Sequence, residues 1–83
     1  MEKLMGCKVI EKLDTLVGSR INLHTGITSV EGELKEKTIN ADHKNYAYYF
    51  VGEDLKIMII INASKKYDFE INDSRTRLSI YEL

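Results

Sequence analysis

The most apolar stretch of the chain covers residues 55–62, Leu-Lys-Ile-Met-Ile-Ile-Ile-Asn, and contains one charge. Its β-branched side chains and its short length favour a strand over a helix. Alternation gives two faces, an apolar one with Leu55, Ile57, Ile59 and Ile61 and a mixed one with Lys56, Met58, Ile60 and Asn62. We therefore predict a central strand with its apolar face in the core and its back half covered.

Further segments alternate apolar and polar residues and are separated by turn residues, as short antiparallel strands are. They cover residues 20–24, 27–34, 46–51, 67–71 and 75–83. A glycine-containing break at 52–54 predicts a hairpin between 46–51 and 55–62. Gly32 lies inside an alternating segment and predicts a bulge or sharp bend, as at the corner of a barrel. The mostly polar residues 35–45 predict a loop or a poor edge strand.

The N-terminal segment, residues 1–17, has apolar residues three or four positions apart, which predicts an amphipathic helix. These residues are Leu4, Cys7, Ile10, Leu13 and Val17. The alternative is a strand over residues 7–13. On either reading the segment has an apolar face that must be covered, and we expect Cys7 in the core or at its boundary.

These elements predict one small domain, residues 1–83, that is mainly β. About six short strands around one core, with a glycine inside one of them, fit a strongly bent antiparallel barrel or sandwich of the SH3-like or Sm-like kind. In this interpretation residues 18–83 form the barrel, and the N-terminal helix covers one open end.

Residues 13–23 read Leu-Asp-Thr-Leu-Val-Gly-Ser-Arg-Ile-Asn-Leu, and Gly-Glu-Leu follows at 32–34. Over this quarter of the chain the sequence resembles the Veg-type bacterial domain, in which Leu-Asp and Gly-x-Arg follow an N-terminal helix and lead into an alternating strand. It also resembles the first half of the Sm motif, in which a later Gly-x-Leu lies on a bent strand. The second Sm motif has no counterpart here, and the hairpin is shorter than in the Veg-type pattern. The resemblance implies a small SH3-like barrel with a regulatory or binding role, and it carries over no RNA-binding residue.

Composition narrows the function classes. With 12 basic and 13 acidic residues the net charge is −1, so no global field favours nucleic acid or an acidic membrane. The single cysteine excludes an internal disulfide and a cysteine-based zinc site, and it suits a reducing compartment. No apolar run approaches the roughly 18 residues of a membrane span, and we expect a cytoplasmic protein without a signal peptide. The abundance of Ile, Lys and Asn, without Pro or Trp, is typical of an AT-rich bacterial or phage genome.

The sequence holds no pattern that we interpret as catalytic. His24 and His43 lack the closely spaced partners of a metal site or a general base, so we interpret both as surface residues. No nucleophile, paired carboxylate or phosphate loop is present in a recognisable motif. We therefore predict no enzyme, no metal and no cofactor.

The candidate binding residues centre on the aromatic segment 46–51. Alternation sends Tyr46, Tyr48 and Phe50 to one face and Tyr49 to the other, so at least one aromatic side chain should lie outside the core. The alternative is that Tyr48 and Phe50 fill the core while Tyr49 covers the back of the sheet. With nearby charges, the candidate partner surface comprises Tyr46, Tyr49, Lys44, Glu31 and Glu33.

Three hypotheses about function follow from these residues. The first is a protein-interaction module that serves as a regulator, adaptor or inhibitor of another macromolecule. The second is an RNA- or DNA-binding barrel that uses Tyr46 or Tyr49 together with the scattered lysines. The third is a self-assembling subunit, a homo-oligomer in which Met58 and Ile60 pack on a second copy.

Overall fold

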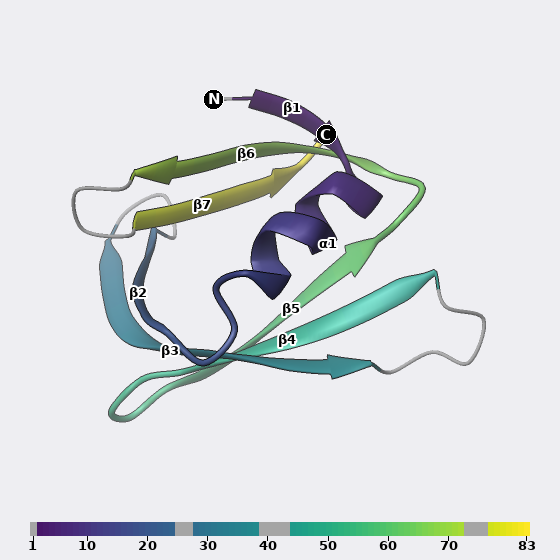
Figure 1. Cartoon of the computed structure of the whole chain (residues 1–83). Coiled ribbons are helices and arrows are strands. Elements are labelled where there is room, and N and C mark those ends of the chain that lie inside the picture. Colours follow the sequence, from purple (N-terminus) through teal and green to yellow (C-terminus); the bar gives the residue numbers. More distant parts are fainter. Residues whose placement is uncertain (1, 25–27, 39–43, 73–76) are drawn as a thin grey trace.

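The computed structural model describes residues 2–24, 28–38, 44–72 and 77–83 of the chain (Figure 1). Within these ranges the elements, in chain order, are β1 (Glu2–Met5), α1 (Gly6–Asp14), β2 (Arg20–His24), β3 (Ser29–Thr38), β4 (Asn45–Val51), β5 (Lys56–Asn62), β6 (Lys66–Asn72) and β7 (Arg77–Glu82). No described helix has the length and hydropathy needed to cross a membrane.

The strands form one sheet in the order β1-β6-β7-β2-β3-β4-β5. The predicted mainly β fold with an N-terminal helix is confirmed. The topology differs from the prediction in one pair, because β2 and β7 run parallel while the other neighbouring strands are antiparallel. The sheet curls around α1, so that β6 and β7 lie across the helix from β4 and β5 (Figure 1).

The corner of this curled sheet is β3. Its first half pairs with β2 and its second half pairs with β4, and Glu33 belongs to both registers. Gly32 lies at the bend, as predicted, where an added Cβ would stand 2.5 Å from the carbonyl oxygen of Val51 and 2.7 Å from the ring of Phe50. A residue without a side chain is therefore needed for the end of β4 to pack against the bend.

Two predicted segment ends are wrong. Residues 35–38, expected in a loop or poor edge strand, continue β3 and pair with β4. The pairing with β4 overrides the polar sequence, because strand formation depends on context as much as on residue type. Leu55, expected on the buried face, precedes β5 and is exposed.

The strand β5, predicted to be central, lies at an edge of the sheet and pairs with β4 alone among the described strands. Ile61 is buried and Ile57 and Ile59 are half-buried, whereas Met58 and Ile60 are 49% and 48% exposed. The assignment of the two faces is confirmed, and the central position is wrong. The run carries apolar residues on both faces, as a strand buried on both sides does, although the outer face of β5 is uncovered.

Within the N-terminal segment, residues 2–14 form a strand and a helix, and the helix is shorter than predicted. β1 pairs with β6, and the buried face of α1 includes Gly6 and Val9. Cys7, expected in the core or at its boundary, is exposed. Because Gly6 packs on the backbone of Asn62, the helix is rotated so that Val9 rather than Cys7 faces the core.

The start of α1 is held by the turn between β5 and β6. The backbone N–H of Gly6 donates to the carbonyl of Lys65 at 2.7 Å, and that of Cys7 donates to the carbonyl of Ala63 at 3.1 Å. A Cβ at Gly6 would overlap the carbonyl oxygen of Asn62. These bonds satisfy N–H groups that a helix cannot pair internally.

The core joins α1 to the inner face of the sheet. Its buried members are Val9, Leu13, Ile21, Leu23, Leu34, Tyr48, Phe50, Ile61, Tyr67, Phe69 and Leu78. Each large apolar side chain of this kind contributes about 1.5–3 kcal/mol when fully buried. The helix supplies two of them, Val9 and Leu13, both fully buried, so the sheet and the helix depend on each other for a complete core.

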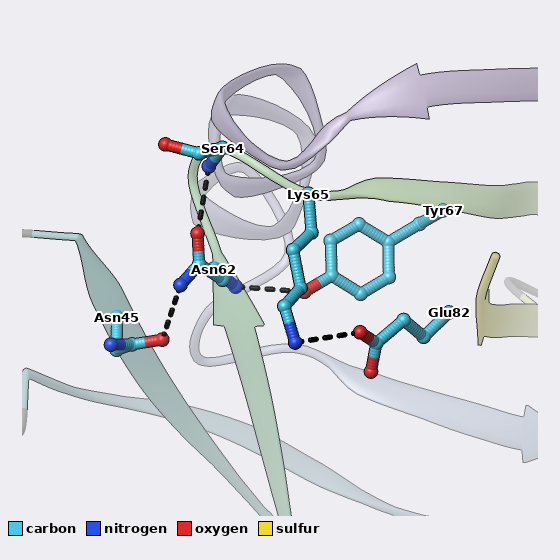
Figure 2. A network of polar contacts seen from close by, with 6 residues as sticks. All are labelled: Asn45, Asn62, Ser64, Lys65, Tyr67 and Glu82. Atoms are coloured by element: carbon cyan, nitrogen blue, oxygen red, sulfur yellow. Dashed lines mark hydrogen bonds and ion pairs between the residues drawn. The ribbon is translucent and has the colours of Figure 1, made fainter.

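A polar network fastens the end of β5 (Figure 2). The side chain of Asn62 donates to Asn45 Oδ1 at 3.0 Å and accepts from the backbone N–H of Ser64 at 2.9 Å. The backbone N–H of Asn62 donates to the hydroxyl of Tyr67 at 2.8 Å. Beside them the Lys65 ammonium lies 2.8 Å from a carboxylate oxygen of Glu82, and this hydrogen bond raises the pKa of Lys65. The network links β4, β5, β6 and the β5–β6 turn, which is hydrogen-bonded to the start of α1.

We expect Gly32→Ala to lower the free energy of unfolding by about 1–3 kcal/mol, because the methyl group meets backbone and a packed ring. Gly52→Ala is the matched control, since its nearest neighbour would be the Glu31 carbonyl oxygen at 3.2 Å. Urea unfolding followed by circular dichroism measures both variants. Equal losses for the two would contradict the role of Gly32 at the corner.

Candidate binding surface

The register of β3, β4 and β5 places alternate residues of the three strands on the side of the sheet away from α1. We call this side the outer face of β3–β5. One cross-strand row joins Lys35, Tyr49 and Met58, and the next joins Glu33, Val51 and Lys56. By the same alternation this face also includes Glu31, Ala47 and Ile60, with Asn45 and Asn62 at its end.

The middle of the outer face of β3–β5 is apolar. Met58 and Ile60 are 49% and 48% exposed, and Tyr49 and Val51 beside them are half-buried. Single exposed apolar residues are ordinary on a protein surface, but adjoining ones on neighbouring strands form a patch. Such a patch suits contact with another macromolecule more than contact with water.

Charged residues of both signs border this apolar strip. Lys35 and Lys56 are exposed on its flanks, and Glu33 is half-buried. The carboxylate of Glu31 lies 3.3 Å from Arg20 Nε, and both side chains are about two-thirds exposed, 64% and 67%. A pair this exposed contributes little to stability, so its charges stay accessible to a partner.

The candidate residues from the sequence do not all come together. Tyr49, Glu31 and Glu33 share the outer face of β3–β5. Tyr46 is on the opposite, inner face, half-buried against the core. Lys44 is exposed and precedes β4, where its carbonyl accepts a hydrogen bond from the N–H of Ala63 at 2.7 Å.

The sequence suggests Met58 and Ile60 only as residues for self-assembly. In the structure they lie beside Tyr49 and are the most exposed apolar residues of this surface. The alternation in 55–62 already separated them from the buried isoleucines. The predicted central position of the strand left its back half covered, whereas at the edge Met58 and Ile60 are about half exposed.

A second polar cluster lies at the other end of the core, where α1 ends. The hydroxyl of Tyr48 donates to Asp14 Oδ1 at 2.8 Å, which ties the last residue of α1 to β4. Burial raises the pKa of Tyr48, and the hydrogen bond to Asp14 raises it further. A hydrogen bond with Asp14 also raises the pKa of Glu36, with burial and the Asp14 charge adding to it. The cluster therefore joins helix and sheet, and its tyrosine stays protonated at ordinary pH.

Among the described residues we find no other group of side chains arranged for catalysis or metal binding. His24 Nδ1 lies 3.2 Å from the hydroxyl of Ser29 on the paired strand. Within the described ranges no group of three or more His, Cys, Asp or Glu side chains is arranged to hold a metal ion. His43 lies outside the described residues.

Comparisons with protein-family models, with curated proteins and with solved structures found no match for this chain. The resemblance to the Veg-type and Sm-like barrels therefore stays a prediction, and the candidate surface rests on its own geometry.

The raised pKa of Glu36 has a consequence for stability. Between the usual value of 4.5 and the raised value, the folded protein binds more protons than the unfolded chain. Stability arising from this group is therefore present at low pH and is lost as the pH rises through that window. We expect Glu36→Gln to stabilise the protein at pH 7, by less than about 1 kcal/mol for so exposed a group.

Thermal unfolding from pH 7 down to about pH 3 measures this effect, and the gain should shrink as Glu36 of the wild type becomes protonated. Glu53→Gln, at an exposed acid of the turn before β5, controls for the change in net charge. A gain that is the same at both ends of the pH range would contradict the assignment.

Proposed function

We propose that this protein is a non-enzymatic interaction module that binds another protein through the outer face of β3–β5. The observation that carries the proposal is the strip formed by Tyr49, Met58 and Ile60, in which two large apolar side chains are about half exposed on a hydrogen-bonded sheet. A rigid surface loses little conformational entropy on binding, and tyrosine is enriched among residues that dominate binding energy.

The charges on this surface favour a protein partner over a nucleic acid. A nucleic-acid surface is expected to be a basic patch of one sign, often with aromatic side chains for stacking. Here Lys56 on β5 lies across Val51 from Glu33, and Lys35 lies two residues from Glu33 on the same strand, β3. An apolar centre with a rim of mixed charge is the usual anatomy of a protein–protein interface.

The size of the domain suits a regulator, adaptor or inhibitor. A domain of 83 residues has little room for a buried reaction site. The resemblance of residues 13–23 and 32–34 to small SH3-like barrels supports the same interpretation. We place its action in the cytoplasm of a bacterium or in phage-infected cells.

To test the proposal, a photo-crosslinking amino acid is placed at Tyr49 and the protein is expressed in its native host. We expect one discrete crosslinked protein that survives nuclease treatment. The same probe at Asp68, on the outer side of β6, is the control and should capture nothing comparable, because β6 lies far from β4 in the sheet order.

Once the partner is identified, binding is measured by calorimetry for Tyr49→Ala and for the conservative Tyr49→Phe. We expect Tyr49→Ala to weaken binding at least about tenfold, about 1.4 kcal/mol, because it removes contact area at the middle of the interface. Tyr49→Phe should retain most of the affinity. Wild-type affinity in the alanine variant, or capture that disappears with nuclease, would refute the proposed surface.

A further inference from the structure

We propose that two copies of this chain associate through the free edge of β5, which pairs antiparallel with β5 of the second copy. The interface uses the backbone edge of the strand and not its outer face. It therefore goes beyond the proposed function and does not depend on a protein partner.

The edge of β5 presents backbone groups that have no strand beside them among the described residues. At the start of the β4–β5 hairpin, the N–H of Gly52 donates to the carbonyl of Leu55 at 2.8 Å. At its end, the N–H of Asn62 donates to the Tyr67 hydroxyl and not to Asn45, its Cα partner on β4. Because backbone groups alternate along a strand, both observations show that the N–H and C=O groups of Met58 and Ile60 point away from β4.

This edge borders an open groove. The groove has a volume of about 270 Å³ and runs along β5, with Leu23, Ile80 and Tyr81 on its opposite side. No residue of α1 lines it, so the helix does not cover the edge at Met58 and Ile60. The backbone edge at Met58 and Ile60 therefore borders the groove and not the helix.

The strand lacks the usual protections against pairing. Natural edge strands carry a central charge, a proline or a bulge. The single charge of β5, Lys56, is at its first position, and its pairing with β4 is continuous from Lys56 to Asn62. A strand of this composition with an uncovered edge is a template for a second strand.

The sequence around β5 matches itself in the antiparallel direction, and this argues for a second copy as the occupant. A two-fold axis at Ile59 places Met58 opposite Ile60 of the second copy, so the outward backbone groups of both copies meet. The same register places Glu53 opposite Lys65 of the second copy. The acidic residues before β5, Glu53 and Asp54, then face the basic residues after it, Lys65 in the turn and Lys66 at the start of β6, at both ends of the pair.

All four charged residues are exposed. Lys65 already pairs with Glu82, but the two side chains are 56% and 53% exposed, so the lysine is at the surface and available to a second carboxylate. Met58 and Ile60 would continue as one apolar strip across the axis. One strand pair is a small interface, so we expect a dissociation constant in the micromolar range.

Two complementary variants test the register. Glu53→Lys with Asp54→Lys leaves basic turns at both ends of β5, and Lys65→Glu with Lys66→Glu leaves acidic turns at both ends. By sedimentation velocity, the wild type should dimerise with rising concentration, and each variant alone should dimerise at least about tenfold more weakly because like charges then meet. An equimolar mixture of the two should recover wild-type association as a heterodimer.

A second measurement covers the case in which a charge variant fails to fold. In the wild type, exchange of the Met58 and Ile60 amide protons, followed by NMR, should slow as the concentration rises. The Ile59 amide faces β4 and should be protected at every concentration. Tyr49→Ala is the control for the outer face and should dimerise like the wild type, which separates this interface from the proposed partner surface.

Three results would overturn the proposal. The first is a wild type that stays monomeric at high concentration, as expected if the edge takes a strand of another protein. The second is a dimer whose Met58 and Ile60 amides exchange as fast as in the monomer. The third is a pair of folded charge variants that each associate as tightly as the wild type.

Discussion

The structure depends on the packing of α1 into the open side of a curled sheet. The two edge strands, β1 and β5, do not pair with each other, so backbone hydrogen bonds alone do not enclose the core. The fully buried side chains of Val9 and Leu13 enclose it instead. The helix reaches this position because Gly6 has no side chain and lies directly on the end of β5.

Two groups of polar contacts hold the two ends of α1 and serve as its anchors. At one end of the helix, backbone N–H groups bond to carbonyls of the β5–β6 turn, which the Asn62 network holds in place (Figure 2). At the other end, Asp14 accepts a hydrogen bond from Tyr48, whose ring belongs to the core. The anchors support the fold, and Met58 and Ile60 on the outer side of β5 stay about half exposed.

Both proposed interactions use β5, one through its outer face and the other through its backbone edge. As an edge strand with apolar side chains on its outer face, β5 can bind another molecule through that face or through its backbone edge. These two surfaces are perpendicular to each other. If two copies join at the edge, their outer faces become one wider sheet surface with two equivalent partner sites. Binding to a partner that also has two sites would then gain from multivalency without any additional contact.

Local patterns in the sequence determined much of this protein. Alternation in 20–24, 46–51 and 67–71 located three strands, and the alternation in β5 separated its buried isoleucines from Met58 and Ile60. Gly32 marked the corner, because only a glycine permits so close a backbone approach. These features follow from the covalent geometry of a few neighbouring residues, which the sequence states directly.

The tertiary structure alone decided the order of the strands and therefore which surfaces are free. The same β-branched run is compatible with a central or an edge position, since the side-chain pattern does not specify whether a neighbour is present. Likewise, the helical spacing of 1–17 allowed Cys7 or Val9 to face inward, and the contact between Gly6 and Asn62 selected Val9. Such choices depend on contacts between residues far apart in the chain, and the local pattern of apolar and polar residues does not contain them.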